Sequence, residues 1–195
     1  MQTGEPAHVE NDADGNAVGA MTVGVVLRDV TDDDLPIFFE QELDPDANYM
    51  AAFTAKDPSD RAAFNAHWAR IRADETVMVR TILWNGVVAG NIASYELSGK
   101  PEVSYWLGKQ YWGKGIAMAA LAAFLSFFTV RPLFAHVAKD NIASIRVLQK
   151  CGFTIAGEST WFANARRAEV EEYLLELRGT VDSCSAWLNG AASMP

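Results

Sequence analysis

The chain has 195 residues, of which 50% are hydrophobic and 21% are charged, and this length can form one domain with a substantial core. These proportions are typical of an ordinary globular protein. The net charge of −9 argues against a nucleic-acid partner, because phosphate binding needs a clustered positive field. An acidic surface also attracts cationic substrates such as amines, although solubility alone is the alternative reason for the charge.

The two ends of the chain differ from its middle. Residues 1–20 are polar, Gly-rich and acidic, so we expect a disordered acidic leader with neither an h-region nor a basic start. Residues 179–195 are expected to form a C-terminal tail, either loose or a short docking segment. The longest apolar run, Ile116 to Val130, is too short to cross a bilayer. We therefore expect a cytoplasmic protein with no membrane partner and one domain in residues 21–178.

Cysteines and histidines give no metal signal. Cys151 and Cys184 are far apart, and His8, His67 and His136 are equally scattered, so neither type matches a metal-ligand spacing. We predict no metal site, and we expect Cys151 to be a buried, inert thiol.

The hydrophobic pattern predicts the elements in chain order. A strand at Val23–Arg28 precedes helices at Asp32–Leu43 and Ser59–Ala73, with Ser59 as the candidate N-cap of the second helix. Strands follow at Val77–Trp84 and Val87–Leu97. Asn-Gly joins these two strands, which is a strong hairpin signal because both residues tolerate positive φ.

The second half continues the alternation. It contains, in order, a strand at Glu102–Leu107, a helix at about Gly115–Phe128, a strand at Leu133–Val137, a helix at Asn141–Cys151, and strands at Phe153–Ser159 and Val170–Leu177. About seven strands and four helices, in an order that mixes hairpins with crossovers, predict one mixed α/β (α+β) sheet.

One strand–loop–helix segment carries the strongest functional signal. The loop after Glu102–Leu107 contains Gly108, Gly113 and Gly115, and an apolar helix begins directly after it. Glycines let the backbone approach a ligand, and the N–H groups and dipole of a helix N-terminus suit a pyrophosphate. No Ser or Thr follows Lys114 and no third glycine completes G-x-G-x-x-G, so neither common nucleotide motif is present. Glycines that only close a turn are the alternative.

This loop resembles the coenzyme A loop of the GNAT acetyltransferase superfamily, which has the form Q/R-x-x-G-x-G/A. The chain reads Gln110-Tyr-Trp-Gly113-Lys-Gly115-Ile-Ala117. Downstream, Asn141-Ile-Ala-Ser144 followed by Lys150-Cys-Gly152-Phe153 is similar to the N-x-x-S/A…K-x-G-F helix of the family. The strand Glu-Val-Ser-Tyr-Trp-Leu before the loop resembles A-E-I-G-Y-W-I of the branch with ribosomal-protein N-terminal acetyltransferases (RimJ/RimL-like).

The resemblance covers about residues 22–178. It implies a GNAT-like sheet, splayed after the fourth strand, and an acetyl-CoA-dependent N-acetyltransferase with no metal. The implied coenzyme-binding residues are Trp106, Leu107, Gly108, Gln110, Gly113, Lys114, Gly115, Ile116, Ala117, Asn141 and Ser144. The pantetheine amides would bond to the backbone at Trp106 to Gly108. Asn141 would bond the pantetheine arm, and a plain helix cap is the alternative.

The chemistry requires a neutral amine and a protonated leaving thiol. Deprotonating a lysine-like amine at pH 7 costs roughly 4–5 kcal/mol, whereas an α-amine costs only about 1 kcal/mol, so a weak base fits an α-amine better. Glu102, which starts the strand, is our candidate general base, with a solvated carboxylate as the alternative. Many family members have a Tyr where this chain has Leu148, so Ser144 is the candidate acid for the thiolate. Alternatively, Ser144 only hydrogen-bonds coenzyme A or a carbonyl.

Three functions remain compatible with these motifs. The first is acetylation of a peptide or protein N-terminal α-amine or of a small-molecule primary amine. The second is a detoxifying acetyltransferase for an amine antibiotic, and the third is a non-catalytic acyl-CoA-binding sensor domain. The sequence names neither the acceptor nor the oligomeric state, which we expect to be a monomer or a homodimer.

Overall fold

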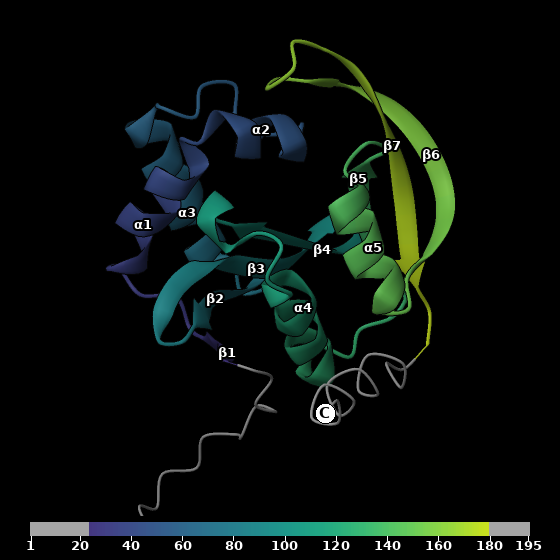
Figure 1. Ribbon diagram of the computed structural model, residues 1–195, viewed down its shortest axis with the longest axis horizontal. Coiled ribbons are helices and arrows are strands. Elements are labelled where there is room, and N and C mark those ends of the chain that lie inside the picture. The colour runs from purple at the N-terminus through teal and green to yellow at the C-terminus, as the bar shows by residue number, and fades with distance from the viewer. Residues whose placement is uncertain (1–23, 180–195) are drawn as a thin grey trace, which may run out of the picture.

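The structure is a computed structural model that describes residues 24–179 of the chain (Figure 1). The predicted leader, Cys184 and nearly all of the predicted tail lie outside these residues. The strands are β1 (Val25–Arg28), β2 (Met78–Trp84), β3 (Val87–Leu97), β4 (Lys100–Leu107), β5 (Leu133–Ala138), β6 (Thr154–Ala163) and β7 (Ala168–Leu177). The helices are α1 (Asp34–Glu42), α2 (Pro45–Ala51), α3 (Arg61–Ala73), α4 (Ile116–Phe127) and α5 (Ile142–Lys150), with a 3-10 turn at Lys109–Tyr111.

The seven strands form one mixed sheet in the order β1-β2-β3-β4-β5-β7-β6, which confirms the predicted fold class. The Asn85-Gly86 turn joins β2 to β3 with φ values of 51° and 80°, as its composition predicts. β5 pairs with β7 along its whole length, whereas β4 and β5 are joined in parallel only at Glu102 and Phe134. Beyond that pair the two strands separate, so the expected splay is present.

Helices cover both faces of the sheet. On one face, α4 and α5 bury an apolar core that includes Ile92 of β3, Leu121 of α4 and Leu148 of α5. On the other face, α1 and α3 pack through aromatic rings, and Phe38 stacks on Trp68 with 5.0 Å between ring centroids. Neighbouring residues of β2 therefore contact different helical layers, with Met78 against the first core and Val79 against the aromatic cluster.

The sequence analysis missed α2 and misplaced the beginning of α3. Asp44 caps α2 by accepting from the N–H groups of residues 46 and 47, each at 2.9 Å, and Pro45 occupies the first turn. The N-cap of α3 is Asp60, which accepts from Ala63 N–H at 2.9 Å. The predicted cap, Ser59, instead donates to Asp57, so that prediction was wrong.

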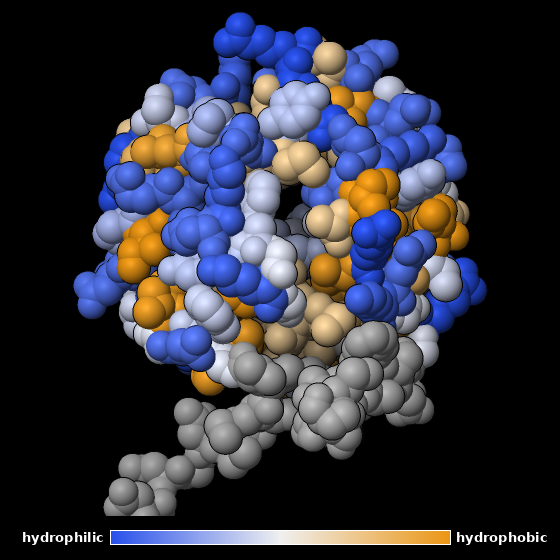
Figure 2. Space-filling model, in the orientation of Figure 1, coloured by the Kyte–Doolittle hydropathy of each residue, from blue (hydrophilic) through white to orange (hydrophobic). Residues whose placement is uncertain are grey.

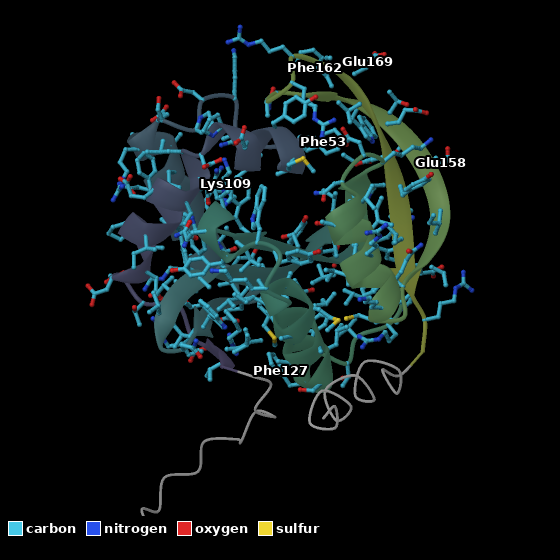
Figure 3. All side chains as sticks on the ribbon, in the orientation of Figure 1. Phe53, Lys109, Phe127, Glu158, Phe162 and Glu169 are labelled. Atoms are coloured by element: carbon cyan, nitrogen blue, oxygen red, sulfur yellow. The ribbon has the colours of Figure 1, made fainter. Side chains whose placement is uncertain are left out.

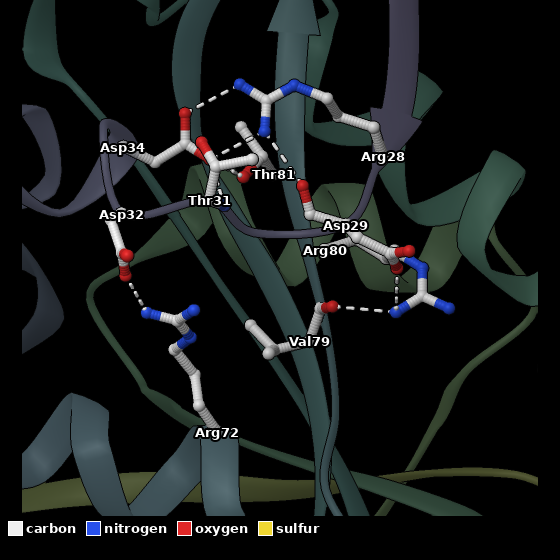
Figure 4. A network of polar contacts seen from close by, with 9 residues as sticks. All are labelled: Arg28, Asp29, Thr31, Asp32, Asp34, Arg72, Val79, Arg80 and Thr81. Atoms are coloured by element: carbon white, nitrogen blue, oxygen red, sulfur yellow. Dashed lines mark hydrogen bonds and ion pairs between the residues drawn. The ribbon is translucent and has the colours of Figure 1, made fainter.

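An ion pair between Arg28 and the buried Asp34 ties β1 to α1 and β2 (Figure 4). The two terminal guanidinium nitrogens of Arg28 each lie 2.6 Å from the Asp34 carboxylate, which also accepts from Thr31 N–H and from the Thr81 hydroxyl. Although burial opposes it, these hydrogen bonds lower the pKa of Asp34 to about 2. The network fixes the beginning of α1 on the sheet.

The β6–β7 hairpin curves back over the sheet, and its turn reaches α2 (Figure 1). Ala165 N–H donates to Ala52 O at 3.4 Å, and the Asn164 amide donates to Thr54 O at 2.9 Å. Phe53 and Phe162 lie at this end of the molecule (Figure 3). The α2 segment and the hairpin turn thus bridge the space above the splayed strands.

Candidate active site

The glycine loop after β4 leaves its backbone open. Gly113 and Gly115 have φ values of 70° and 76°, and a Cβ atom added at either would meet nothing within 4 Å. A group that needs close approach to the backbone therefore has room there. The predicted loop residue Gln110 lies in the 3-10 turn, and its side chain folds back toward Gly108.

Helix α4 begins directly at this loop. Its N-cap is Gly115, which contributes no side-chain acceptor, so the first-turn N–H groups have no capping partner. Ile116 is buried beneath them and Ala117 is half-buried. The Lys114 ammonium lies 4.9 Å from the centroid of the Trp84 ring, which keeps a cation beside the loop. The donors, the helix dipole and this cation together suit a pyrophosphate.

The edge of β4 that faces β5 is unpaired beyond Glu102. Gly108 N–H donates to Ala89 O of β3 at 3.0 Å, so alternation turns the backbone groups of Tyr105 and Leu107 toward β5. The Leu107 carbonyl already accepts from the Trp112 indole at 3.0 Å. Of the segment predicted to bond the pantetheine amides, Leu107 N–H is thus oriented toward the gap, whereas Gly108 N–H is not.

A cavity of about 910 Å³ passes through the gap between the splayed strands, and Figure 2 shows the molecule hollowed at its centre. One side of the cavity is formed by α5 and the other by α2, α3 and the segment between them. Its walls include Ser104 and Trp106 of β4, His136 of β5, Asn141 and Ser144 at the beginning of α5, and Trp68 of α3. The cavity therefore connects the two faces of the sheet.

Several buried polar atoms of the cavity wall have no hydrogen-bond partner. They are Thr54 Oγ1, Trp68 Nε1, Tyr105 OH and Trp106 Nε1, and all four residues line the cavity. Buried polar groups in proteins are nearly always paired, and exceptions need an explanation. A polar ligand in the cavity would supply the missing partners.

The beginning of α5 joins the cavity wall to α2. Asn141 Oδ1 accepts from Ser144 N–H at 3.2 Å, which makes Asn141 the N-cap of α5, and its amide donates to Met50 O at 3.2 Å. Both ends of this amide therefore have protein partners, so the helix-cap alternative is observed. The predicted contact with pantetheine stays a prediction.

Ser144 lies close to a buried tyrosine. Burial raises the pKa of Tyr105 to about 12, and the nearby Ser144 hydroxyl acts against this shift, although the two groups do not reach hydrogen-bonding geometry. Leu148, one turn further along α5, also lines the cavity. The place of the absent family tyrosine is thus apolar, and the hydroxyls on this side belong to Ser144 and Tyr105.

The candidate base Glu102 is buried behind a histidine. Its carboxylate is only 4% exposed and lies 3.2 Å from His136 Nε2, while His136 Nδ1 lies 2.7 Å from Glu172. These hydrogen bonds raise the pKa of His136 to about 10, so the ring is a cation at neutral pH. His136 lines the cavity and Glu102 does not, so Glu102 contacts the cavity through His136.

Sequence reasoning missed His136 and Glu172. Glu172 also accepts from the Ser159 hydroxyl at 2.8 Å, and although burial opposes it, the bonds from His136 and Ser159 lower its pKa. Strand alternation could have placed Glu172 on one face of β7, but the order of the strands brings it to β5. Among residues 24–179, no group of three metal-ligating side chains could hold a metal ion.

The comparisons identify the family. The acetyltransferase (GNAT) domain family matches residues 25–154, which is more than half of the chain. This chain belongs to the GNAT acetyltransferase family, as its two sequence blocks predict. Within the described part of the chain, no helix has the length and apolarity to span a membrane.

Individual relatives agree with the predicted branch. The chain is 27% identical over 118 residues to the Putative ribosomal N-acetyltransferase YdaF of Bacillus subtilis (strain 168), an alignment that covers 55% of this chain and 64% of that protein. It thus spans slightly less than two thirds of this curated relative. RimJ of Mycobacterium smegmatis, in complex with CoA-disulfide, has a TM-score of 0.72 at 22% identity and covers 86% of this chain and 89% of its own.

The same fold occurs in a spermidine N-acetyltransferase. The spermidine N-acetyltransferase from Vibrio cholerae, in complex with CoA and spermine, has a TM-score of 0.68 at 15% identity. The match covers 83% of this chain and 98% of that one. At such identities the two solved structures show a shared fold only, and they leave the acceptor open.

Proposed function

We propose that this protein transfers the acetyl group of acetyl-CoA to a primary amine, with a peptide or protein N-terminal α-amine as the acceptor. The observation that carries this proposal is the cavity between β4 and β5, which reaches from α5 on one face to α3 on the other. Such a passage lets a thioester approach from one face and an amine from the other.

Acetyl-CoA would lie along the predicted residues. Its pyrophosphate would bind at Gly113 to Ala117, where the backbone is open and α4 begins. The pantetheine arm would enter the gap beside Leu107 and bring the thioester to the orphan polar atoms of the cavity wall. The resemblance to GNAT enzymes supports this placement.

An α-amine fits this cavity better than a lysine-like amine. The wall combines aromatic side chains with carboxylates that would attract a cationic amine. An α-amine at pH 7 needs only about 1 kcal/mol to become neutral. The likeness to YdaF and RimJ supports this class. A small-molecule amine is the second candidate, because the cavity is large enough to enclose one and the fold is shared with a spermidine acetyltransferase.

In the proposed reaction the amine nitrogen bonds to the thioester carbonyl carbon and the C–S bond breaks. Ser144 would donate a proton to the departing thiolate, and it would recover one from the nitrogen of the tetrahedral intermediate. The Tyr105 hydroxyl, which has no hydrogen-bond partner of its own, lies near Ser144 on the same side of the cavity. Because Glu102 is shielded by His136, any proton that Glu102 takes must travel through that ring or through water.

The test is release of free CoA thiol from acetyl-CoA with three probes: a short peptide with a free α-amine, an N-blocked peptide containing lysine, and spermidine. We expect turnover with the first probe to exceed the others at pH 7. Turnover with spermidine alone would mean that the acceptor is a small-molecule amine and not a peptide α-amine. Acetyl-CoA binding by calorimetry without turnover on any probe would instead support the sensor alternative.

Glu102→Gln tests the predicted base in the same assay. If Glu102 takes the proton, the variant should keep its fold and acetyl-CoA affinity and lose about 10²–10⁴-fold in rate at pH 7. The loss should shrink as the pH approaches the pKa of the acceptor. A variant with full activity at pH 7 contradicts a catalytic role for Glu102.

A further inference from the structure

The end of α1 contributes a carboxylate, that of Glu42, to the wall of the cavity. Glu42, the last residue of α1, lines the cavity together with Trp106. Its neighbour Gln41 packs against Gly108, because a Cβ atom added at Gly108 would lie 3.0 Å from Gln41 Cγ. Glu42 is thus held next to the point where β4 ends and the coenzyme loop begins.

Among the described residues, nothing pairs with the Glu42 carboxylate. It forms no hydrogen bond or ion pair, and only its backbone carbonyl is bonded, by the Asn48 amide at 2.5 Å. Burial raises the pKa of Glu42 to about 7, and the negative end of the α1 dipole disfavours its charge further. An unpaired, half-buried carboxylate in a cavity is costly to keep, so it points to a role with a ligand.

The other acids near this cavity are already engaged. Asp57, Asp60 and Asp74 line it, but each accepts from backbone N–H groups of its own turn or helix. On α2, Asp44 caps the helix and Asp46 pairs with Lys109. Glu42 is therefore the cavity-lining carboxylate without a competing partner in the described part of the chain.

The basic side chains that line the cavity do not pair with Glu42 either. His67 and Arg70 project from α3, and burial lowers the pKa of His67, which favours its neutral form. His136 is held between two other carboxylates. None of these groups is within ion-pair distance of Glu42.

We propose that Glu42 accepts the proton of the acceptor's ammonium group, so that the neutral amine can attack the thioester. This proposal rests on the proposed function. The ammonium gives one proton to the carboxylate and the amine nitrogen bonds to the carbonyl carbon. The second N–H proton leaves the tetrahedral intermediate and the thiolate gains one proton as the C–S bond breaks. The carboxylic acid then returns its proton to water, so one proton is released per acetyl group transferred.

This assignment replaces the base predicted from the sequence, Glu102, with a carboxylate that sequence reasoning did not consider. Glu102 faces a histidine cation that lies between it and the cavity, whereas Glu42 faces the cavity itself. A base with a pKa near the working pH is also the most effective, because it combines a useful ionised fraction with adequate basicity. Glu102 then acts on the site through His136, as a positioning residue.

The test compares Glu42→Gln with Glu40→Gln, an exposed glutamate on the same helix that lies outside the cavity. Both variants are assayed from about pH 6 to pH 9 with the amine probe on which the unaltered enzyme is most active. Calorimetry with acetyl-CoA and melting curves accompany the assays. We expect Glu42→Gln to lower kcat by about 10²–10⁴-fold at pH 7, with unchanged acetyl-CoA affinity and melting temperature.

The pH profile decides between roles. In the unaltered enzyme the rate should rise through about pH 7 as Glu42 ionises. In Glu42→Gln this rise should be absent, and the rate should increase only as the pH approaches the pKa of the amine itself. A higher KM with unchanged kcat, a loss that does not vary with pH, or a loss equal to that of Glu40→Gln would each overturn the proposal. If the unaltered enzyme acetylates none of the probes, the proposed function fails first and this inference falls with it.

Discussion

Arg166 in the β6–β7 turn holds Asp140, just before α5, through two hydrogen bonds of 2.6 and 3.0 Å. Its Nε donates to Tyr49 O of α2 at 2.8 Å, and the guanidinium lies 4.4 Å from the centroid of the Tyr49 ring. One side chain thus connects the hairpin, α2 and the beginning of α5. Two of these segments, α2 and the beginning of α5, form walls of the cavity.

Arg166→Lys should therefore weaken the connection between these three segments. A lysine keeps the charge but cannot form the two-pronged contact or stack on the ring, so we expect a loss of about 1–2 kcal/mol in the free energy of unfolding. Urea denaturation measures it. The control is Arg167→Lys in the same turn, where the side chain is exposed. Equal stability of the two variants would show that the contacts of Arg166 contribute nothing.

Substituting Asn or Asp, which have the same shape, for Gly115 tests whether the coenzyme pyrophosphate binds at this loop. Asn and Asp both tolerate positive φ and fill the open space at Gly115 equally, but only Asp places a negative charge beside the expected pyrophosphate. Gly115→Asp should weaken acetyl-CoA binding at least about tenfold more than Gly115→Asn, and the difference should shrink at high salt. Calorimetry at two salt concentrations measures both. Matching affinities at low salt would place the pyrophosphate elsewhere.

Local signals were sufficient for much of the fold. The Asn85-Gly86 turn and the glycine loop have the conformations their composition predicts, because positive φ is a property of single residues. Helix α2 escaped prediction because its seven residues show no apolar repeat, even though Asp44-Pro45 is an adequate start signal.

The cluster of charged residues in the site could not be predicted from the sequence, for a different reason. Glu102, His136 and Glu172 come from β4, β5 and β7, and they meet only because β7 inserts beside β5 in the sheet. No spacing along the chain encodes such an insertion. Glu42 was missed for a similar reason, since burial by other elements, rather than its own sequence context, makes it unusual.

The Arg28–Asp34 pair makes stability depend on acid pH. Because the folded pKa of Asp34, about 2, is below its unfolded value, the ionised carboxylate stabilises the protein above the unfolded pKa and this contribution disappears as the pH falls through about 2. Asp34→Asn should lower the free energy of unfolding by about 2.5 kcal/mol at pH 7 and by progressively less below about pH 4. Urea denaturation across this range measures the difference.

The matched control for this pair is Asp32→Asn. Asp32 pairs with Arg72, but its side chain is 85% exposed, so its removal should cost less than about 1 kcal/mol at any pH. If Asp34→Asn and Asp32→Asn lower the free energy of unfolding equally at pH 7, the burial of Asp34 does not strengthen its ion pair with Arg28.

His136 makes stability depend on alkaline pH, with the opposite sign. Its folded pKa of about 10 is above the ordinary value of 6.5, so the cation stabilises the fold fully below about pH 6.5 and loses this effect as the pH rises through about 10. His136→Gln removes the cation and leaves Glu102 and Glu172 buried together, which should lower the melting temperature most near pH 7. The gap from the unaltered protein should narrow toward pH 10, where His136 itself becomes neutral.

Melting curves between about pH 6 and pH 10 measure this gap. The control is His67→Gln, because His67 has no carboxylate partner among the described residues and burial lowers its pKa. That variant should therefore show no narrowing toward alkaline pH. Parallel curves for His136→Gln and the unaltered protein would mean that the ring is neutral at pH 7. In that case one ring nitrogen would turn a lone pair toward a carboxylate, an arrangement that the 2.7 Å and 3.2 Å contacts of His136 make unfavourable.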